Sequence, residues 1–326
     1  MKFDSIYIEK DILYLKGVKM FLKKNKSENI IECESYKEIF NLKNQNFRIQ
    51  KNNQSLILAK KKNNYVLKTP DQFSIGFKDN YYFSHMLNCI YDCKYCFLQG
   101  MYNSANLVFF VNYHDFAKKI KEICEGSKRS ICFFSGYDCD SLALENITNF
   151  SHYFINLFRH LKGHFLEIRT KSVNISFLKN IKVVDNVIIA FSLNPDSIIS
   201  KFELKTPSLN KRIRAISYLQ SLGWNVGLRF DPVMYSDNFE ENYKYFFKEI
   251  FSNINSKKIH SITIGRFRMP KSFFSKLSKI RPYDNFLYQN YEANKTTVSH
   301  EKKIDIQEFC FNEIKKYTAA ENIYFN

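Results

Sequence analysis

The sequence lacks any long hydrophobic run. Its longest apolar stretches, Leu107–Val111 and Val187–Phe191, are far too short to span a lipid bilayer. The first four residues, Met1-Lys2-Phe3-Asp4, are charged and lead into no apolar segment of the kind that a signal peptide contains. From these absences we expect a soluble cytoplasmic protein without a signal peptide.

Turn and linker residues are scarce as well. The 326 residues include only 9 Gly and 6 Pro, and they contain no Gly/Ser linker, low-complexity block or internal repeat. Hydrophobic residues make up 45% and charged residues 25%, which excludes a disordered chain and indicates a globular one. The length permits one large α/β domain or two smaller ones.

Acidic residues are in the minority. The 32 Asp and Glu face 49 Lys and Arg, which gives a formal net charge of +17. Several lysines stand in short groups: Lys60-Lys61-Lys62, Lys118-Lys119, Lys257-Lys258, Lys302-Lys303 and Lys315-Lys316. Such an excess attracts a polyanion such as DNA or RNA. The chain is also rich in Lys, Asn, Ile and Phe throughout, so genomic base composition explains the charge equally well, and the charge alone leaves nucleic-acid binding open.

The chain has no dense disulfide framework, because eight cysteines are too few for one at this length. Clustered cysteines in a cytosolic protein indicate metal binding or catalysis instead. Three of them stand within one short segment, Cys89-Ile-Tyr-Asp-Cys93-Lys-Tyr-Cys96, and no fourth lies nearby. The spacing is C-x3-C-x2-C.

The missing fourth cysteine bears on the kind of metal site. A structural zinc ion takes four protein ligands, and a [4Fe–4S] cluster usually takes four thiolates. Three thiolates would leave one iron open, as radical S-adenosylmethionine (SAM) chemistry requires. The alternatives are a zinc site completed by His85 and a chance grouping of structural cysteines. We favour the open cluster, because three cysteines in a loop between a strand and a helix are not typical of a core.

Strand-length apolar runs alternate with helix-length segments after residue 75. The strand candidates are Tyr81–Leu87, Ser130–Phe134, Phe165–Thr170, Val187–Leu193, Asn225–Phe230 and Ser261–Gly265. The helix candidates are His114–Cys124, Leu142–Leu161, Val173–Lys179, Leu209–Leu222 and Glu240–Phe251. Strands rich in Val, Ile and Phe without alternation are typical of a parallel sheet covered by helices. We predict an α/β fold with a partial (β/α)6 TIM-type barrel at 76–270, a small N-terminal α/β extension at 1–75 and a C-terminal extension at 271–326.

Polar residues gather where the predicted strands end. They are Ser135 to Asp140, Arg169-Thr170-Lys171, Ser192, Asn194, Arg229, Asp231 and Arg266. In a parallel barrel the active site lies at the carboxyl ends of the strands. This grouping is independent of the cysteine spacing, and it predicts an active site at the same edge of the sheet.

The cysteine loop continues as Cys96-Phe97-Leu98-Gln99, and the whole segment resembles the cluster loop of the spore photoproduct lyase family, C-x3-C-x-Y-C-Y-L-Q. Thr170-Lys171 resembles the family's T-K after the third strand, and Phe191-Ser192-Leu193-Asn194 resembles its F-S-[IL]-N. The segment from Thr206 to Ile213 is similar to a helix start in the same family. The resemblance covers roughly residues 76–270.

The resemblance implies a radical SAM lyase that repairs 5-thyminyl-5,6-dihydrothymine, a cross-linked thymine pair in ultraviolet-damaged DNA. Its cofactors would be SAM and a [4Fe–4S] cluster held by Cys89, Cys93 and Cys96. A 5′-deoxyadenosyl radical takes a hydrogen from the damaged base, and a cysteine thiol later returns one to the product thymine. The implied partners are DNA, whose damaged bases must be reached within a duplex, and an electron donor such as flavodoxin or ferredoxin.

Two departures from the family pattern concern the quenching of the radical. The lyases place the donor cysteine in a stretch resembling F-E-A-A-C-T-S-D, and this chain has Tyr137 at the aligned position, with Cys139 two residues later. Of the family's tyrosine pair, Tyr95 matches, while Phe97 stands in place of the second tyrosine. The departures keep open a radical SAM enzyme of the same fold that acts on RNA, a peptide or a small metabolite. A non-enzymatic zinc or nucleic-acid-binding protein is a further alternative.

Contacts to SAM follow from position and resemblance. Ser135-Gly136, with the acids Asp138 and Asp140, stands where most radical SAM enzymes bind the methionine amino group, and Asp140 aligns with the lyase pattern. Lys171 is placed to pair with the methionine carboxylate. The remaining contacts expected are hydrogen bonds from Ser192 and Asn194 and packing of Phe97 near the adenine.

Overall fold

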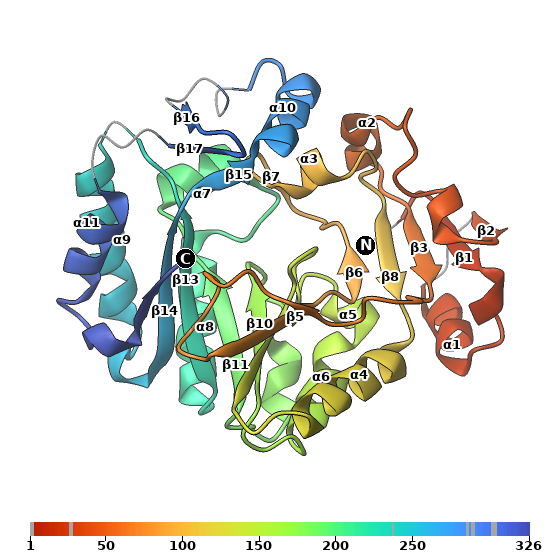
Figure 1. Ribbon diagram of the computed structural model, residues 1–326, viewed down its shortest axis with the longest axis horizontal. Helices are drawn as coiled ribbons and strands as arrows, with labels where there is room; N and C mark the ends of the chain where they lie inside the picture. Colours follow the sequence, from red (N-terminus) through yellow and green to blue (C-terminus); the bar gives the residue numbers. More distant parts are fainter. Residues whose placement is uncertain (1–2, 26–28, 237, 285–286, 288–290, 301–304) are drawn as a thin grey trace.

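The computed structural model describes residues 3–25, 29–236, 238–284, 287, 291–300 and 305–326. Its two main sheets lie side by side (Figure 1), with the N-terminal sheet at one end of the molecule and a larger, curved sheet filling the rest. Within the described ranges, every helix is too short or too polar to cross a bilayer.

The larger sheet contains eight described strands in the order β18-β14-β13-β11-β10-β9-β5-β4. Pairing is parallel from β5 through to β18, and only β4 runs antiparallel to its neighbour. The bounds are β4 Leu67–Lys68, β5 Asp79–Phe83, β9 Ile131–Ser135, β10 Phe165–Thr170, β11 Val187–Ser192, β13 Asn225–Val233, β14 Ile259–Arg266 and β18 Ile323–Phe325. The six long parallel strands and their curvature confirm the predicted partial barrel.

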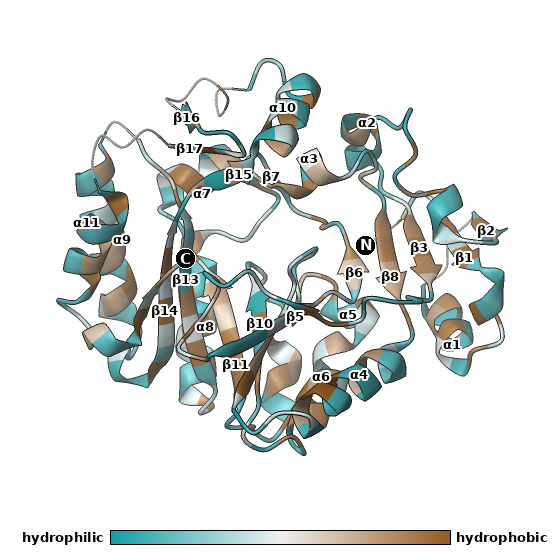
Figure 2. Ribbon diagram, viewed as in Figure 1, coloured by the Kyte–Doolittle hydropathy of each residue, from teal (hydrophilic) through white to brown (hydrophobic). Residues whose placement is uncertain are grey.

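Strand β11 shows why apolar and polar residues do not alternate along the strands of this sheet. All six of its residues are buried, although successive side chains point to opposite faces. Ile189 and Phe191 pack into the main hydrophobic core, whereas Ile188 packs with Ile75 and Cys132 on the other face. Both faces of the strand are therefore dry, and Figure 2 shows the central strands as a hydrophobic layer beneath polar helix surfaces.

Helices cover the outer face of the barrel sheet (Figure 1). They are α4 Tyr113–Glu125, α6 Phe150–Phe158, α8 Leu209–Ser221, α9 Phe239–Asn253 and α11 Ile306–Ile314. The short helices α5 Glu145–Thr148 and α7 Asp196–Phe202 lie in the connections that follow β9 and β11.

The prediction of one continuous helix over Leu142–Leu161 is wrong. Asn149 adopts a left-handed conformation, with φ 50° and ψ 30°, and separates α5 from α6. The Glu145 carboxylate accepts a hydrogen bond from the backbone N–H of Ser151 at 3.0 Å and so caps the second helix. Val173–Lys179 was likewise predicted as a helix, and the structure has only a short 3-10 segment at Ser176–Asn180.

The N-terminal sheet has the order β2-β1-β3-β8-β6. Its strands are β1 Ile6–Glu9, β2 Ile30–Cys33, β3 Leu56–Ala59, β6 Met86–Leu87 and β8 Leu107–Phe110, and α1 Lys16–Lys24 and α2 Phe47–Asn52 accompany them. Two of these strands, β6 and β8, come after residue 75, and β18 of the barrel sheet comes after residue 270. The division of the chain at those positions stays a prediction, because both sheets take strands from across it.

The cysteine loop lies between the two sheets and beneath the C-terminal segment (Figure 1). The elements there are β7 Asp92–Cys93, α3 Leu98–Met101, β12 Glu203–Leu204, β15 Arg268–Pro270, α10 Lys271–Ile280, β16 Tyr291–Ala293 and β17 Thr297–His300. Gly100 in α3 lets α10 approach closely, since a Cβ at that position would lie 2.3 Å from the carbonyl oxygen of Phe273. The loop is thus enclosed by segments that are distant in the sequence.

Candidate active site

A cavity of about 530 Å³ opens at the carboxyl ends of the barrel strands. It is lined by twelve of the thirteen site residues that the sequence predicts: Cys89, Cys93, Tyr95, Cys96, Phe97, Ser135, Gly136, Tyr137, Cys139, Asp140, Lys171 and Ser192. Asn194 is absent from the described lining. The strand-end reasoning and the cysteine spacing therefore lead to one site.

The cysteine loop is fixed from several sides. Strand β7 pairs antiparallel with β12, so that Cys93 stands opposite Glu203. Asp92 binds two arginines, Arg48 of α2 at 2.7 Å and Arg281 beyond α10 at 2.6 Å. Buried Lys51 donates a hydrogen bond to the carbonyl oxygen of Cys89. Contacts from the N-terminal extension, the barrel and the C-terminal segment thus set the loop's shape.

The three loop cysteines are free thiols that face the same cavity. Burial raises the pKa of Cys89 to about 12 and also raises the pKa of Cys93 and Cys96. Bound iron would offset this effect, because a metal cation stabilises the coordinating thiolate. Lys51 and Lys171 lie close enough to lower the pKa of these thiols in part. The donor set and its positive surroundings fit a [4Fe–4S] cluster.

The alternative of a zinc site completed by His85 does not fit the arrangement. Among the described residues, no three His, Cys, Asp or Glu side chains converge as the ligands of one metal ion do. His85 stacks on Phe150, with ring centres 3.9 Å apart, and its Nδ1 lies 3.9 Å from the sulfur of Cys139. The cysteines of a cluster bind different irons and need not converge on one point.

Asp140 is fully engaged in fixing the ends of two strands. Its Oδ1 accepts hydrogen bonds from the Thr170 hydroxyl at 2.6 Å and from the backbone N–H of Ala143 at 2.9 Å. Its Oδ2 accepts one from the backbone N–H of Lys171 at 2.6 Å. The carboxylate therefore positions Lys171, and its expected contact with the SAM amino group stays a prediction.

The turn after β9 is tightly packed. Ser135 Oγ bonds to Ser141 Oγ at 2.8 Å and donates to the carbonyl oxygen of Glu167 at 3.0 Å. Gly136 has a φ of 80°, and a Cβ there would lie 2.4 Å from Ser141 Oγ. Only glycine allows this turn, so the backbone of Gly136 can approach a ligand closely. Asp138, which follows, is buried and has a pKa raised by that burial.

Lys171 stays charged at the cavity wall. Burial alone would lower its pKa, but the negative charge of Glu203, with a smaller contribution from Cys93, outweighs that effect and raises it. Its Nζ lies 5.7 Å from the ring centre of Tyr95. A charged ammonium in this position can bind an anionic group such as a carboxylate.

Ser192 and Asn194 differ in what they face. Ser192 lines the cavity and accepts a hydrogen bond from Arg169 Nε at 3.3 Å. Asn194 is 2% exposed, and it donates to Glu203 at 3.0 Å while accepting from the Tyr243 hydroxyl at 3.3 Å. Both ends of its amide are occupied by protein groups, so the structure gives Asn194 a buried contact behind the cavity wall, and its hydrogen bond to SAM stays a prediction.

A buried polar network supports the loop from below. The Tyr95 hydroxyl donates to Glu203, and the other oxygen of that carboxylate accepts from Arg212 at 2.6 Å. The side chains of Glu203 and Arg212 are 0% exposed. Arg212 also donates to the carbonyl oxygen of Ser192 at 2.9 Å. The network joins the cysteine loop to the ends of β11 and α8.

Both candidates for the hydrogen-atom donor line the cavity. The Tyr137 ring is 37% exposed, with its centre 4.5 Å from that of Tyr82 and 5.6 Å from that of Phe97. Cys139 is 9% exposed and lies against His85. Burial is the main cause of a strongly raised pKa at Cys139, which keeps the thiol protonated and its S–H bond available.

His85 makes the stability of the protein depend on pH. Burial lowers its pKa from 6.5 to about 3, so the folded chain holds the imidazole neutral while the unfolded chain protonates it below 6.5. Above pH 6.5 His85 is neutral in both states, and as the pH falls below 6.5 its protonation favours the unfolded chain. We expect the free energy of unfolding to fall by about 1 kcal/mol between pH 7.0 and 5.5 because of His85.

Urea unfolding of the wild type and of His85→Phe at the two pH values measures this contribution. The phenyl ring retains the stacking on Phe150 but cannot be protonated, so the pH-dependent loss should shrink by about 1 kcal/mol in the variant. Equal pH dependence in the two proteins would show that His85 is not the group responsible.

Other lining residues were not assigned as site residues from the sequence. Arg169 and Asp231 form an ion pair at 3.5 Å, and the Arg268 guanidinium lies 5.1 Å from the ring centre of Phe73. The strand-end positions of Arg169 and Asp231 indicated that they lie near the site. Tyr82 and Phe73 reach the cavity only through tertiary packing. Arg229, also at a strand end, is buried against Glu167 at 2.7 Å and forms part of the cavity wall.

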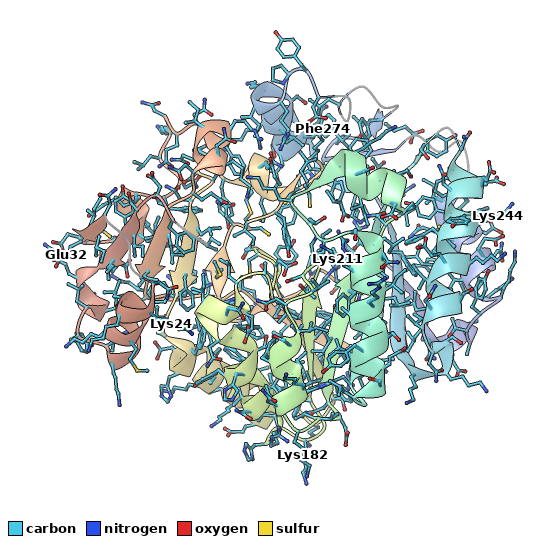
Figure 3. All side chains as sticks on the ribbon, turned by 180° about the vertical axis from the view of Figure 1, so that it is seen from behind. Lys24, Glu32, Lys182, Lys211, Lys244 and Phe274 are labelled. Atoms are coloured by element: carbon cyan, nitrogen blue, oxygen red, sulfur yellow. The ribbon has the colours of Figure 1, made fainter. Side chains whose placement is uncertain are left out.

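The positive charge is spread over the molecule. Figure 3 shows the exposed lysines Lys24, Lys182 and Lys244 at widely separated places on the surface. Arg169 and Lys171, by contrast, line the cavity itself. The net charge therefore does not by itself define a nucleic-acid interface.

Comparisons with known proteins agree with one another. The family model described as "Spore photoproduct lyase" matches residues 1–323. A spore photoproduct lyase from Clostridium acetobutylicum is 24% identical over 258 residues, which cover 76% of this chain and 74% of that protein. One from Bacillus subtilis is 24% identical over 217 residues, which cover 66% of this chain and 61% of its own length.

Solved structures show the same fold. A mutant spore photoproduct lyase with bound AdoMet and dinucleoside spore photoproduct matches with a TM-score of 0.83 and 16% identity, over 100% of this chain and 99% of that one. A spore photoproduct lyase complexed with dinucleoside spore photoproduct also gives a TM-score of 0.83 at 16% identity, and 99% of each chain is covered.

Proposed function

The chain belongs to the spore photoproduct lyase family, and we propose on that basis that it is a radical SAM lyase that repairs spore photoproduct in DNA. The observation that carries the proposal is the single cavity that brings the three loop cysteines together with the strand-end residues. The cysteine spacing and the strand-end positions each predict a site at this edge of the sheet. The family membership supplies the reaction and its substrate.

Cys89, Cys93 and Cys96 are the residues that would hold a [4Fe–4S] cluster. Bound together, the cluster and SAM supply a 5′-deoxyadenosyl radical. The chain's own part is to fix the loop, through Glu203 opposite Cys93 and the two arginines on Asp92.

Lys171 would pair with the methionine carboxylate of SAM, and Asp140 holds that lysine's backbone in place. The Ser135-Gly136 turn offers backbone groups at close range, Ser192 offers its hydroxyl, and Phe97 offers a ring face for the adenine. Tyr95 lines the same region, but its hydroxyl is bonded to Glu203. Its contribution would be to hold the loop and Lys171, alongside any part in hydrogen return.

DNA would be the macromolecular substrate, and the damaged bases would have to leave the helix to reach the cavity. The excess of Lys and Arg favours approach to the phosphate backbone. Reduction of the cluster calls for a one-electron donor of the flavodoxin or ferredoxin kind, and both would meet the enzyme in the cytoplasm.

The reaction is tested with reconstituted enzyme, SAM, dithionite and a spore-photoproduct dinucleotide under anaerobic conditions. We expect thymine to be formed, in proportion to the 5′-deoxyadenosine formed or the SAM turned over. Formation of 5′-deoxyadenosine without any thymine would reject the lyase assignment. It would favour another substrate, the alternative that Phe97 and Tyr137 raise.

The same assay separates the two donor candidates. Either Cys139 or Tyr137 gives its S–H or O–H hydrogen to the product thymine radical, leaving the new radical on that side chain. We expect whichever of Cys139→Ala and Tyr137→Phe lacks the true donor to cleave SAM still, but to release aberrant, unquenched thymine products. Wild-type product patterns from both variants would mean that neither residue donates.

A further inference from the structure

The cysteine loop faces the solvent as well as the cavity. Its three cysteines line the cavity, whereas Lys94, which stands between Cys93 and Cys96, does not, and its side chain is 23% exposed. The backbone N–H of Lys94 donates to the carbonyl oxygen of Phe202 at 2.7 Å, which holds the loop against the end of α7. The surface around Lys94 is therefore separated from the thiols only by the loop itself.

The ion pairs at this surface expose their basic members and bury their acids. Arg48 of α2 binds Asp92 through two N–H groups, at 2.7 and 2.9 Å, and the arginine side chain is 30% exposed while the aspartate is 5% exposed. Lys94 lies 3.1 Å from Asp284, whose side chain is 8% exposed. Because the carboxylates lie beneath the cations, the groups that meet the solvent are positive.

Lys205 adds a third positive group beside the loop. It comes directly after β12, in which Leu204 is the pairing partner of Asp92. Its side chain is exposed, and its Nζ donates to the backbone carbonyl oxygen of Lys51 at 3.4 Å; Lys51 in turn donates to the carbonyl oxygen of Cys89. Within the part of the chain that the structure describes, Lys205 forms no ion pair, so its charge is available to a partner.

Arg48, Lys94 and Lys205 together form a surface that we call the basic face, and none of them lines the cavity. DNA has to bring its damaged bases to the cavity, so this face is poorly placed for the substrate. A reductant has the opposite requirement. It has to approach the loop closely, because electron transfer falls off steeply with distance, but it must leave the cavity free for SAM and the lesion.

We propose that the basic face is the docking surface for the electron donor, and that this donor is a small protein with an acidic surface. The proposal rests on the proposed function. One electron leaves the carrier, which is oxidised, and enters the [4Fe–4S] cluster, which is reduced from the 2+ to the 1+ state, and no covalent bond forms or breaks. Opposite charges on the two faces speed the encounter and orient the carrier toward the loop.

Lys205→Glu tests the proposal, with Lys182→Glu as the matched control. Both substitutions reverse the charge of an exposed lysine, but Lys182 lies near the start of β11, at the opposite ends of the barrel strands (Figure 3). Binding of oxidised flavodoxin to the reconstituted enzyme, measured by calorimetry at low salt, should weaken roughly 3- to 10-fold in Lys205→Glu and stay unchanged in the control. The difference should shrink at high salt, because ions screen exposed charges.

The rate of 5′-deoxyadenosine formation separates docking from chemistry. With reduced flavodoxin, the carrier concentration that gives half the maximal rate should rise by the same factor in Lys205→Glu. With dithionite, a small ion that needs no docking surface, the rate should equal that of the wild type. Lys205→Asn should show a smaller effect of the same kind, since it removes the charge and asparagine tolerates the left-handed backbone at this position, where φ is 64°.

Three results would overturn the proposal. They are wild-type binding of flavodoxin and ferredoxin by Lys205→Glu, an equal loss of rate with dithionite, and weaker binding of duplex DNA in place of the carrier. Thymine formation by the wild type with dithionite would leave the lyase function intact in each case. A wild type that cleaves no SAM with dithionite would overturn the proposed function and this proposal together.

Discussion

Replacing Cys93 by alanine is expected to abolish cluster binding and, with it, all reductive cleavage of SAM. Cys93 is 6% exposed and stands in β7, held opposite Glu203 of β12. Only two thiols would remain in the loop, and no other cysteine in the described residues lines the cavity except Cys139, which lies against His85. Two thiolates cannot replace the three needed to keep one iron open.

Iron and sulfide analysis after anaerobic reconstitution measures the first effect, and 5′-deoxyadenosine formation measures the second. Cys124→Ala is the matched control, since Cys124 is a buried thiol of α4 outside the cavity. It should retain iron, colour and SAM cleavage. A colourless wild type with stoichiometric zinc, or a Cys93→Ala protein that still cleaves SAM, would refute the assignment of the loop.

Replacing Glu203 by alanine is expected to destabilise the fold by about 3–5 kcal/mol, because it leaves a buried guanidinium without its counter-charge. Arg212 and Glu203 are 2.6 Å apart, and both side chains are 0% exposed. The same carboxylate accepts hydrogen bonds from the Tyr95 hydroxyl and the Asn194 amide, so two further polar groups lose a partner. The cysteine loop should loosen together with the core, since β12 is its pairing strand.

Urea unfolding gives the change in free energy, and iron content after reconstitution reports the state of the loop. Glu203→Gln should be less damaging, since an amide retains the acceptor oxygen. Glu122→Ala is a surface control: its ion pair with Lys119 has both side chains nearly half exposed, and its loss should cost less than about 1 kcal/mol. A Glu203→Ala protein as stable as this control would show that the buried pair contributes little.

The fold could be predicted well where the pattern of neighbouring residues in the sequence decides the conformation. The unbroken apolar pattern of Val187–Leu193 predicts a strand buried on both faces, and β11 covers Val187–Ser192 of it. The helix over Leu142–Leu161 was mispredicted, because its apolar pattern continues through Asn149. The left-handed conformation of Asn149 separates the two helices, and the Glu145 carboxylate caps the second one at Ser151.

The candidate site likewise contains residues whose place the sequence predicts and one, Asn194, whose contacts only the fold determines. Spacing in a short loop predicts that Cys89, Cys93 and Cys96 act together, since the ligands of a cluster lie close together in the sequence. Strand-end position predicts that Lys171 and Ser192 lie at the same place, since parallel strands bring their carboxyl ends to one edge, and all five residues line the cavity. Asn194 obeys the same rule, yet its amide is taken by Glu203 and Tyr243, partners that the order of residues does not disclose.

The sequence by itself therefore determined the class of chemistry, the partial barrel and the edge at which the site lies, because each depends on local spacing or on a repeated pattern. Only the tertiary structure decided which polar groups are free to meet a ligand. Glu203 and Arg212 neutralise each other out of reach of solvent, and the Asn194 amide is taken by Glu203 and Tyr243, while Lys171 and Ser192 line the cavity. Whether a polar side chain is satisfied depends on atoms from distant segments, and these become neighbours only when the chain folds.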